Sequence, residues 1–69
     1  MPVLVIEDQL MFRDVLSHLL TDRMDIKEVI AVESCGEARN VFKADKFDFV
    51  IVDVDLPDGD GLELADEFA

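Results

Sequence analysis

The sequence predicts an α/β fold in which helices alternate with the strands of a parallel sheet, and two observations lead to this class. First, short apolar runs rich in valine and isoleucine recur along the chain without polar alternation. Strands covered on both faces of a parallel sheet have this pattern. Second, the segments between these runs carry apolar residues at helical spacing, which is typical of right-handed strand–helix–strand units.

The first expected strand is Val3–Ile6, and it ends abruptly at the acidic pair Glu7 and Asp8. We expect an amphipathic helix over Gln9–Thr21, because its apolar residues gather on one face. That face, with Val15 adjoining it, consists of Phe12, Leu16, Leu19 and Leu20.

The second expected strand is Glu28–Glu33, which is rich in β-branched residues. Ser34 and Glu37 then form an S-x-x-E capping box, in which the serine accepts from an early helix amide and the glutamate reaches back. The helix that follows is expected to close within Lys43–Lys46. Its apolar stripe consists of Ala38, Val41 and Phe42.

Phe47–Val52 is the third expected strand, and it ends at Asp53. Asp55–Asp60 is expected to be a loop, because the residue before a proline disfavours helix and Asp-Gly is typical of turns. Gly61–Ala69 is predicted to open a third helix. The aspartates within the loop are expected to form turns rather than to bind ligands through their side chains, namely Asp55, Asp58 and Asp60.

Composition limits the classes of function. The 69 residues, 51% hydrophobic and 33% charged, suit one small globular unit. The net charge of −11, from 17 acidic and 6 basic residues, argues against direct binding of nucleic acid or an anionic membrane and favours a small cation. No apolar run approaches the roughly 20 residues of a membrane span. A lone cysteine, Cys35, fits a reducing, cytoplasmic compartment.

Acidic residues follow two of the expected strands, Glu7 and Asp8 after the first and Asp53 after the third. Ligands of open parallel sheets bind beyond the carboxyl ends of the strands. If the two strands are neighbours, three carboxylates converge there, and their repulsion has to be relieved by a retained proton or a bound cation. Carboxylate oxygens suit Mg²⁺, and an aspartate can also be a phosphoryl nucleophile.

Three other functions can be weighed against this pattern. A calcium-binding EF-hand loop starting at Asp53 fails, because its sixth position is Asp58 instead of glycine and its twelfth is Leu64 instead of glutamate. The D-x-D run of Asp53 to Asp55 resembles the nucleophile motif of dehalogenase-like phosphatases, which would be an enzyme. That motif usually follows a first strand, and it leaves the acidic pair unexplained. An inactive acidic interaction fragment is the third alternative.

Three segments, taken in order, resemble the first half of a response-regulator receiver domain of two-component signalling. They are VLVIEDQLMFRDVL, SCGEARNVF and FDFVIVDVDLPDGDGLEL, and the resemblance extends over Val3–Phe68. It implies a flavodoxin-like parallel sheet of three strands, truncated at the start of the third helix. Residues 1–69 would then be a single partial receiver domain without its C-terminal half.

The resemblance also implies roles for single residues. Asp53 would be the phosphoacceptor, modified by a sensor histidine kinase with Mg²⁺. Asp8 and Asp53 would ligate the metal, Glu7 would act through a water molecule, and Asp55 would contribute its backbone carbonyl. A dehalogenase-like phosphatase would need the Asp55 side chain instead. The implied function is a regulatory phosphoprotein in cytoplasmic transcription regulation, and not an enzyme.

The family's later serine or threonine, lysine and output surface fall outside these segments. We therefore expect this stretch alone to bind Mg²⁺ weakly and to be phosphorylated poorly. The third strand would also present an open apolar edge, Phe49–Val52, which can pair with another chain. A homodimer through this edge or through uncovered helix faces is the expected assembly.

Overall fold

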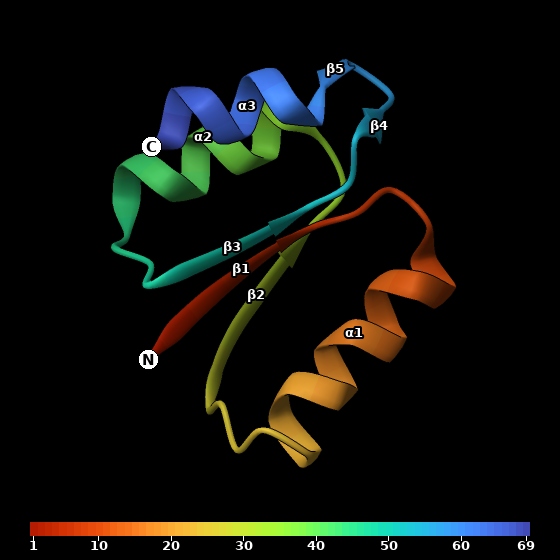
Figure 1. Ribbon diagram of the computed structural model, residues 1–69, viewed down its shortest axis with the longest axis vertical. Coiled ribbons are helices and arrows are strands. Elements are labelled where there is room, and N and C mark those ends of the chain that lie inside the picture. Colours follow the sequence, from red (N-terminus) through yellow and green to blue (C-terminus); the bar gives the residue numbers. More distant parts are fainter.

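The computed structural model describes residues 1–69 as a three-stranded parallel sheet with helices on both faces (Figure 1). The strand order is β2-β1-β3, which is the start of the flavodoxin-like order 2-1-3-4-5. The strands are β1 (Pro2–Ile6), β2 (Glu28–Val32) and β3 (Phe49–Val52). The helices are α1 (Leu10–Asp22), α2 (Cys35–Ala44) and α3 (Gly61–Phe68). The predicted α/β class and the order of its elements are confirmed.

Alternate residues of β1 face two separate apolar layers. Leu4 and Ile6 lie in a cluster with buried residues of α2 and α3, whereas Val3 and Val5 pack with Leu20 on the α1 side. Figure 1 shows the same division, with α2 and α3 side by side on one face of the sheet and α1 alone on the other. The four β1 side chains are at most 1% exposed. The central strand is therefore covered from both sides, as its unbroken apolar sequence predicts.

The apolar face predicted for α1 is only partly buried. Leu20 is buried and Leu16 packs against the same cluster, but Phe12 and Leu19 are 54% and 47% exposed. The positions of α1 that pack on the sheet, Leu16 and Leu20, lie four residues apart and form a single stripe along the helix. Three further apolar residues of α1 are exposed, namely Leu10, Met11 and Val15.

The segment predicted as a loop contains a short antiparallel hairpin instead, formed by β4 (Asp55–Leu56) and β5 (Gly59–Asp60). Pro57 and Asp58 occupy its turn. Leu56 is only 8% exposed and lies in the cluster beneath α2 and α3. Burial of this one side chain draws the hairpin against the helices, which a local turn pattern does not reveal.

The start of α2 agrees with half of the predicted capping box. The Ser34 hydroxyl accepts from the Glu37 amide at 3.2 Å, but the Glu37 carboxylate does not accept from the Ser34 amide in return. Strand β3 begins two residues later than expected. Phe47 lies outside the strand, and its ring stacks on Phe42 with 6.3 Å between centroids. None of the three helices has the length and apolar character that crossing a membrane requires.

Candidate functional site

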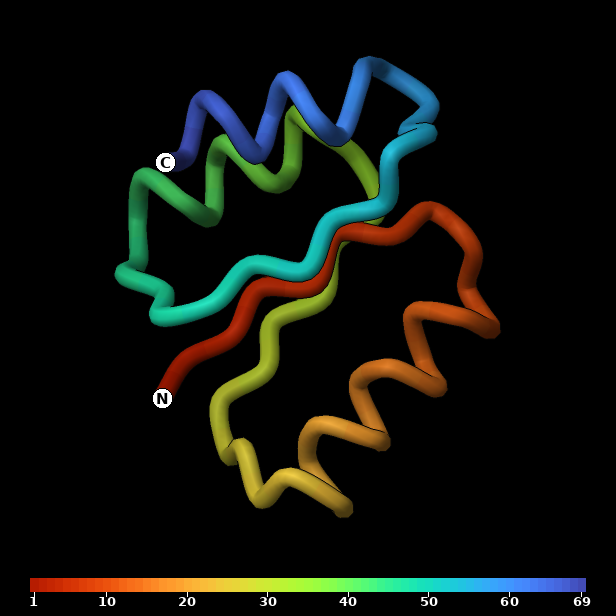
Figure 2. The backbone as a smooth tube through the Cα atoms, viewed as in Figure 1, coloured from red at the N-terminus to blue at the C-terminus, as the bar shows by residue number.

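The acidic residues of interest are the first residues beyond two adjacent strands. Ile6 of β1 is in register with Val52 of β3, and the ladder continues one step further, where the Asp53 amide donates to the Ile6 carbonyl at 2.9 Å. On the other side of β1, the Glu7 amide donates to the Val32 carbonyl at 3.0 Å. Figure 2 shows the β1 and β3 segments running side by side before the chain diverges beyond their ends. Regular strand pairing therefore fixes the backbone of both acids.

Three carboxylates converge at this edge of the sheet. Glu7, Asp8 and Asp53 each offer an oxygen, and these atoms all lie within 4.8 Å of one another. Glu7 is 8% exposed, Asp53 is half-buried and Asp8 is exposed. The convergence expected from the order of strands is thus present. The site is buried at Glu7 and exposed to solvent at Asp8.

The cluster carries negative charge that the chain does not neutralise. Burial raises the pKa of the Glu7 carboxyl, and the neighbouring Asp53 and Asp8 raise it further, against the lowering effect of the Gln9 amide. That amide donates to the Glu7 carboxylate at 3.3 Å. Arg13 forms no ion pair with the three clustered carboxylates. Its guanidinium donates to the main-chain carbonyl of Glu7 at 3.0 Å and lies 3.6 Å from the Glu33 carboxylate.

A small hard cation fits this set of donors. Every side-chain donor is a carboxylate oxygen, the ligand type that Mg²⁺ and Ca²⁺ prefer, and both ion pairs of the structure lie elsewhere, at Arg13–Glu33 and Arg39–Glu67. A dication would offset the repulsion from Asp53 and Asp8, which adds to the effect of burial in raising the pKa of Glu7. The Asp55 side chain is outside the group, and its amide lies 3.4 Å from the Asp53 carboxylate. A metal contact from the Asp55 carbonyl stays a prediction.

An apolar groove of about 340 Å³ adjoins the carboxylates, between α1 and β3. Its lining consists of Glu7, Asp53 and six apolar residues, Ile6, Phe12, Leu16, Ile51, Val52 and Val54. Apolar walls strengthen electrostatic interactions at the neighbouring acids, because they exclude the water that would screen charge.

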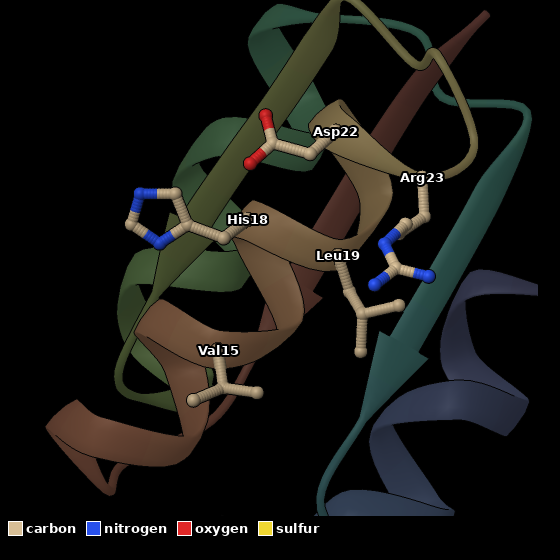
Figure 3. A pocket seen from close by; sticks show the side chains of 5 residues that line it. All are labelled: Val15, His18, Leu19, Asp22 and Arg23. Atoms are coloured by element: carbon tan, nitrogen blue, oxygen red, sulfur yellow. The ribbon is translucent and has the colours of Figure 1, made fainter.

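A second hollow, of about 300 Å³, lies on the outer surface of α1 (Figure 3). His18 and Asp22 extend to one side of the helix there, and Leu19 and Arg23 to the other. His18 is exposed, and its Nδ1 lies 3.1 Å from the Asp14 carbonyl. The hollow contains none of the three clustered acids and is separate from the candidate site.

Sequence reasoning missed what two aspartates of the hairpin do. The Asp58 carboxylate accepts from the amides of Cys35 at 2.7 Å and Gly36 at 3.0 Å, and these bonds lower its pKa. Asp60 accepts from the Leu62 amide at 2.8 Å and caps α3. An aspartate directly before an expected helix is a capping signal and could have identified Asp60. No local signal identifies Asp58, because its partners lie more than 20 residues away.

Gly61 was expected only to begin a helix, and the structure gives it a steric role beside Asp53. A Cβ atom at this position would lie 1.8 Å from the Asp53 carbonyl oxygen. The amide of Gly61 donates to the Val54 carbonyl at 2.8 Å. The start of α3 therefore packs directly on the main chain of the candidate phosphoacceptor.

Comparison with known protein families matches residues 3–69 to the response regulator receiver domain. The chain is 30% identical over 67 residues to the sensory transduction protein LytT of Enterococcus faecalis, a match that covers 97% of this chain and 28% of that protein. It is 32% identical over 64 residues to protein-glutamate methylesterase/protein-glutamine glutaminase 2 of Vibrio vulnificus, covering 93% of this chain and 19% of that protein. The chain thus spans less than a third of either relative. No solved structure matches.

Proposed function

The chain belongs to the response regulator receiver domain family, and on this premise we propose that Asp53 accepts a phosphoryl group as the input of a two-component signalling switch. The observation that carries the proposal is the convergence of Glu7, Asp8 and Asp53 at the ends of two adjacent parallel strands. Residues 1–69 would act as one regulatory unit within this switch, with no enzymatic turnover of their own.

The proposed cofactor is Mg²⁺, held by the carboxylates of Asp8 and Asp53 and by the main-chain carbonyl of Asp55, with Glu7 acting through a water molecule. The donor chemistry and the absence of a basic partner support this assignment. When bound, the cation would offset the negative charge of the acids and of an incoming phosphoryl group.

The proposed donor is a phosphohistidine of a sensor histidine kinase. A carboxylate oxygen of Asp53 forms a bond to phosphorus while the bond from phosphorus to the imidazole nitrogen breaks, and the nitrogen keeps the electron pair. The hydrogen bond from the Asp53 amide to Ile6 holds the nucleophile at the end of β3 during this exchange. The neighbouring carboxylates repel an anionic phosphoryl group, so the transfer would need a cation bound at Glu7, Asp8 and Asp53 to offset their charge.

The proposed setting is a cytoplasmic pathway that regulates transcription, in which this segment contacts neither nucleic acid nor membrane. Its net charge of −11 supports the second part of this statement. A second copy of the chain is the proposed partner of the outer edge of β3, which pairs only with β1. Phe49, at 58% exposed, lines an apolar hollow of about 230 Å³ beside that edge.

Incubation with acetyl phosphate and Mg²⁺, followed by intact-mass spectrometry, tests the proposed function. We expect a slow and partial gain of one phosphoryl group by the wild-type chain and no gain by Asp53→Asn. Asp55→Asn should be modified to the same extent as wild type, because only the main chain of Asp55 is required. A dehalogenase-like phosphatase would instead turn over a phosphate ester and lose this activity in Asp55→Asn. No response to Mg²⁺ in either assay would favour an interaction segment without phosphoryl chemistry.

A further inference from the structure

The start of α2 is capped from two different parts of the chain. The first amides of a helix have no partner within it and need acceptors from outside. Ser34, which directly precedes the helix, accepts from the Glu37 amide at 3.2 Å. The amides of Cys35 and Gly36 instead donate to the two carboxylate oxygens of Asp58, at 2.7 and 3.0 Å. Local and distant acceptors thus share the end of one helix.

The hairpin that carries Asp58 is also docked on α2 by packing. Leu56 is 8% exposed and lies in one cluster with Cys35 and Ala38. On the opposite strand of the hairpin, a Cβ atom added at Gly59 would lie 2.9 Å from the Cys35 sulfur, so the backbone there lies flush against the helix. The contact between the hairpin and α2 therefore has an apolar part, from Leu56 and Gly59, and a polar part, from the two hydrogen bonds to Asp58.

This hairpin is the segment that connects the candidate phosphoacceptor to α3. It begins at Asp55, two residues after Asp53, and it ends at Asp60, directly before the glycine that packs on Asp53. The base of the segment is closed by the bond from the Gly61 amide to the Val54 carbonyl at 2.8 Å. Its tip is held by Asp58. Without the tip contact, the packing of Leu56 and the hydrogen bond at the base would still restrain the hairpin.

We propose that Asp58 is a positioning residue for the acidic site, which holds the segment from Asp53 to Gly61 in place by bonding the first two amides of α2. A carboxylate suits this task, since the N-terminus of a helix carries partial positive charge and bonds to an ionised acceptor are stronger than neutral ones. The inference rests on the proposed function, because the segment so fixed contains the proposed metal-binding carbonyl of Asp55.

Asp58→Ala removes both bonds at the tip, and Asp58→Asn keeps one carbonyl oxygen as an acceptor. Ser34→Ala is the matched control, because it removes an acceptor from the same helix end without touching the hairpin. Two quantities are measured on each chain. One is hydrogen exchange of the Gly61 amide by nuclear magnetic resonance without metal, and the other is Mg²⁺ affinity by calorimetric titration.

We expect the Gly61 amide to exchange about tenfold faster in Asp58→Ala than in wild type, with Asp58→Asn between them and Ser34→Ala close to wild type. Mg²⁺ affinity should fall about tenfold in Asp58→Ala alone. This is the smaller end of the roughly 10- to 100-fold loss in affinity that follows removal of a residue that orients metal ligands. Equal effects of Asp58→Ala and Ser34→Ala on both quantities would show that Asp58 only stabilises α2, and would overturn the inference.

The exchange measurement separates this inference from the proposed function. If the wild-type chain fails to bind Mg²⁺, the proposed function is wrong, and the exchange rates still decide whether Asp58 holds the segment. If the wild-type chain binds Mg²⁺ and all variants bind it equally well, the proposed function stands and the positioning role is refuted.

Discussion

Substitution of Gly61 by alanine should distort the candidate phosphoacceptor more than its small size suggests. The added Cβ would lie 1.8 Å from the Asp53 carbonyl oxygen, 2.7 Å from the carbonyl carbon and 3.0 Å from the Val54 Cα. Reaching even 3.0 Å from the oxygen requires a movement of about 1.2 Å, the difference between those two distances. All three atoms belong to the main chain, so no side-chain rotation can relieve the contact.

The size of the effect follows from two destabilising contributions and one opposing contribution. Overpacking that shifts the backbone typically costs about 1–3 kcal/mol. Weakening the bond from the Gly61 amide to Val54 adds about 0.5–1.5 kcal/mol. The greater helix propensity of alanine returns up to about 1 kcal/mol. We therefore expect Gly61→Ala to lower the free energy of unfolding by about 0.5–4.5 kcal/mol.

Gly36→Ala is the matched control for this substitution. Its Cβ would meet only Asp58 Oδ2 at 3.5 Å and Ser34 Oγ at 4.0 Å, which are ordinary contacts. No glycine of the chain has a positive φ, so the backbone at this position accepts alanine. The control should be neutral or more stable than wild type by up to about 1 kcal/mol, because alanine loses less backbone entropy in a helix.

Urea unfolding monitored by far-ultraviolet circular dichroism suits this chain, which has no tryptophan or tyrosine for a fluorescence assay. The midpoint should fall for Gly61→Ala and stay constant or rise for Gly36→Ala. Equal midpoints for Gly61→Ala and wild type would refute the reasoning, since they would mean that α3 can move away from Asp53 without loss.

Four further predictions follow from burial and charge. The substitution Leu64→Ala should lower the free energy of unfolding by about 2–5 kcal/mol, because the Leu64 side chain is only 1% exposed. In the same urea assay the control substitution Leu62→Ala should lower the free energy of unfolding by less than about 0.5 kcal/mol, because Leu62 is 63% exposed. Because the pKa of Glu7 is raised above its ordinary 4.5, its contribution to stability is complete below pH 4.5 and is lost as pH rises through the folded value. Glu7→Gln without metal should therefore gain stability over wild type towards neutral pH, and a constant difference across that range would contradict this. The pKa of Asp58 is lowered from 3.8, so its contribution is present above pH 3.8 and is lost as pH falls through the folded value. Urea midpoints measured down to acidic pH should show less acid destabilisation in Asp58→Asn. Light scattering should detect a wild-type dimer that Phe49→Lys dissociates, and a folded wild-type monomer at high concentration would exclude pairing through the β3 edge.

Local patterns in the sequence predict most of the fold and the centre of the site. The apolar run before Glu7 and the one before Asp53 are strands, and strand–helix alternation makes them parallel. Two parallel strands that are direct neighbours bring their carboxyl ends together, so the clustering of the acids follows from strand order. These inferences need only short-range periodicity and the handedness of crossovers.

Features that depend on distant contacts could not be predicted in this way. Asp58 has the sequence context of a turn residue, and its role as a cap for α2 exists only because the tertiary fold brings residue 35 to it. The exposure of Phe12 and Leu19 likewise depends on how much sheet lies beneath α1. Periodicity identifies an apolar face of a helix but does not reveal how much of it is covered.

The burial of Val3 to Ile6 in β1 has a consequence for how the register of the strand is set. Since Val3 to Ile6 are apolar on both faces, a slip by one residue would exchange the two faces without placing a polar side chain of this run in either core. The acidic end of the strand opposes one such slip, because moving Glu7 into the position of Ile6 would place its carboxyl in the apolar cluster beneath α2 and α3. The acids that form the site therefore also act as a stop for strand alignment, and neutralising them loosens a constraint on folding as well as the affinity for a cation.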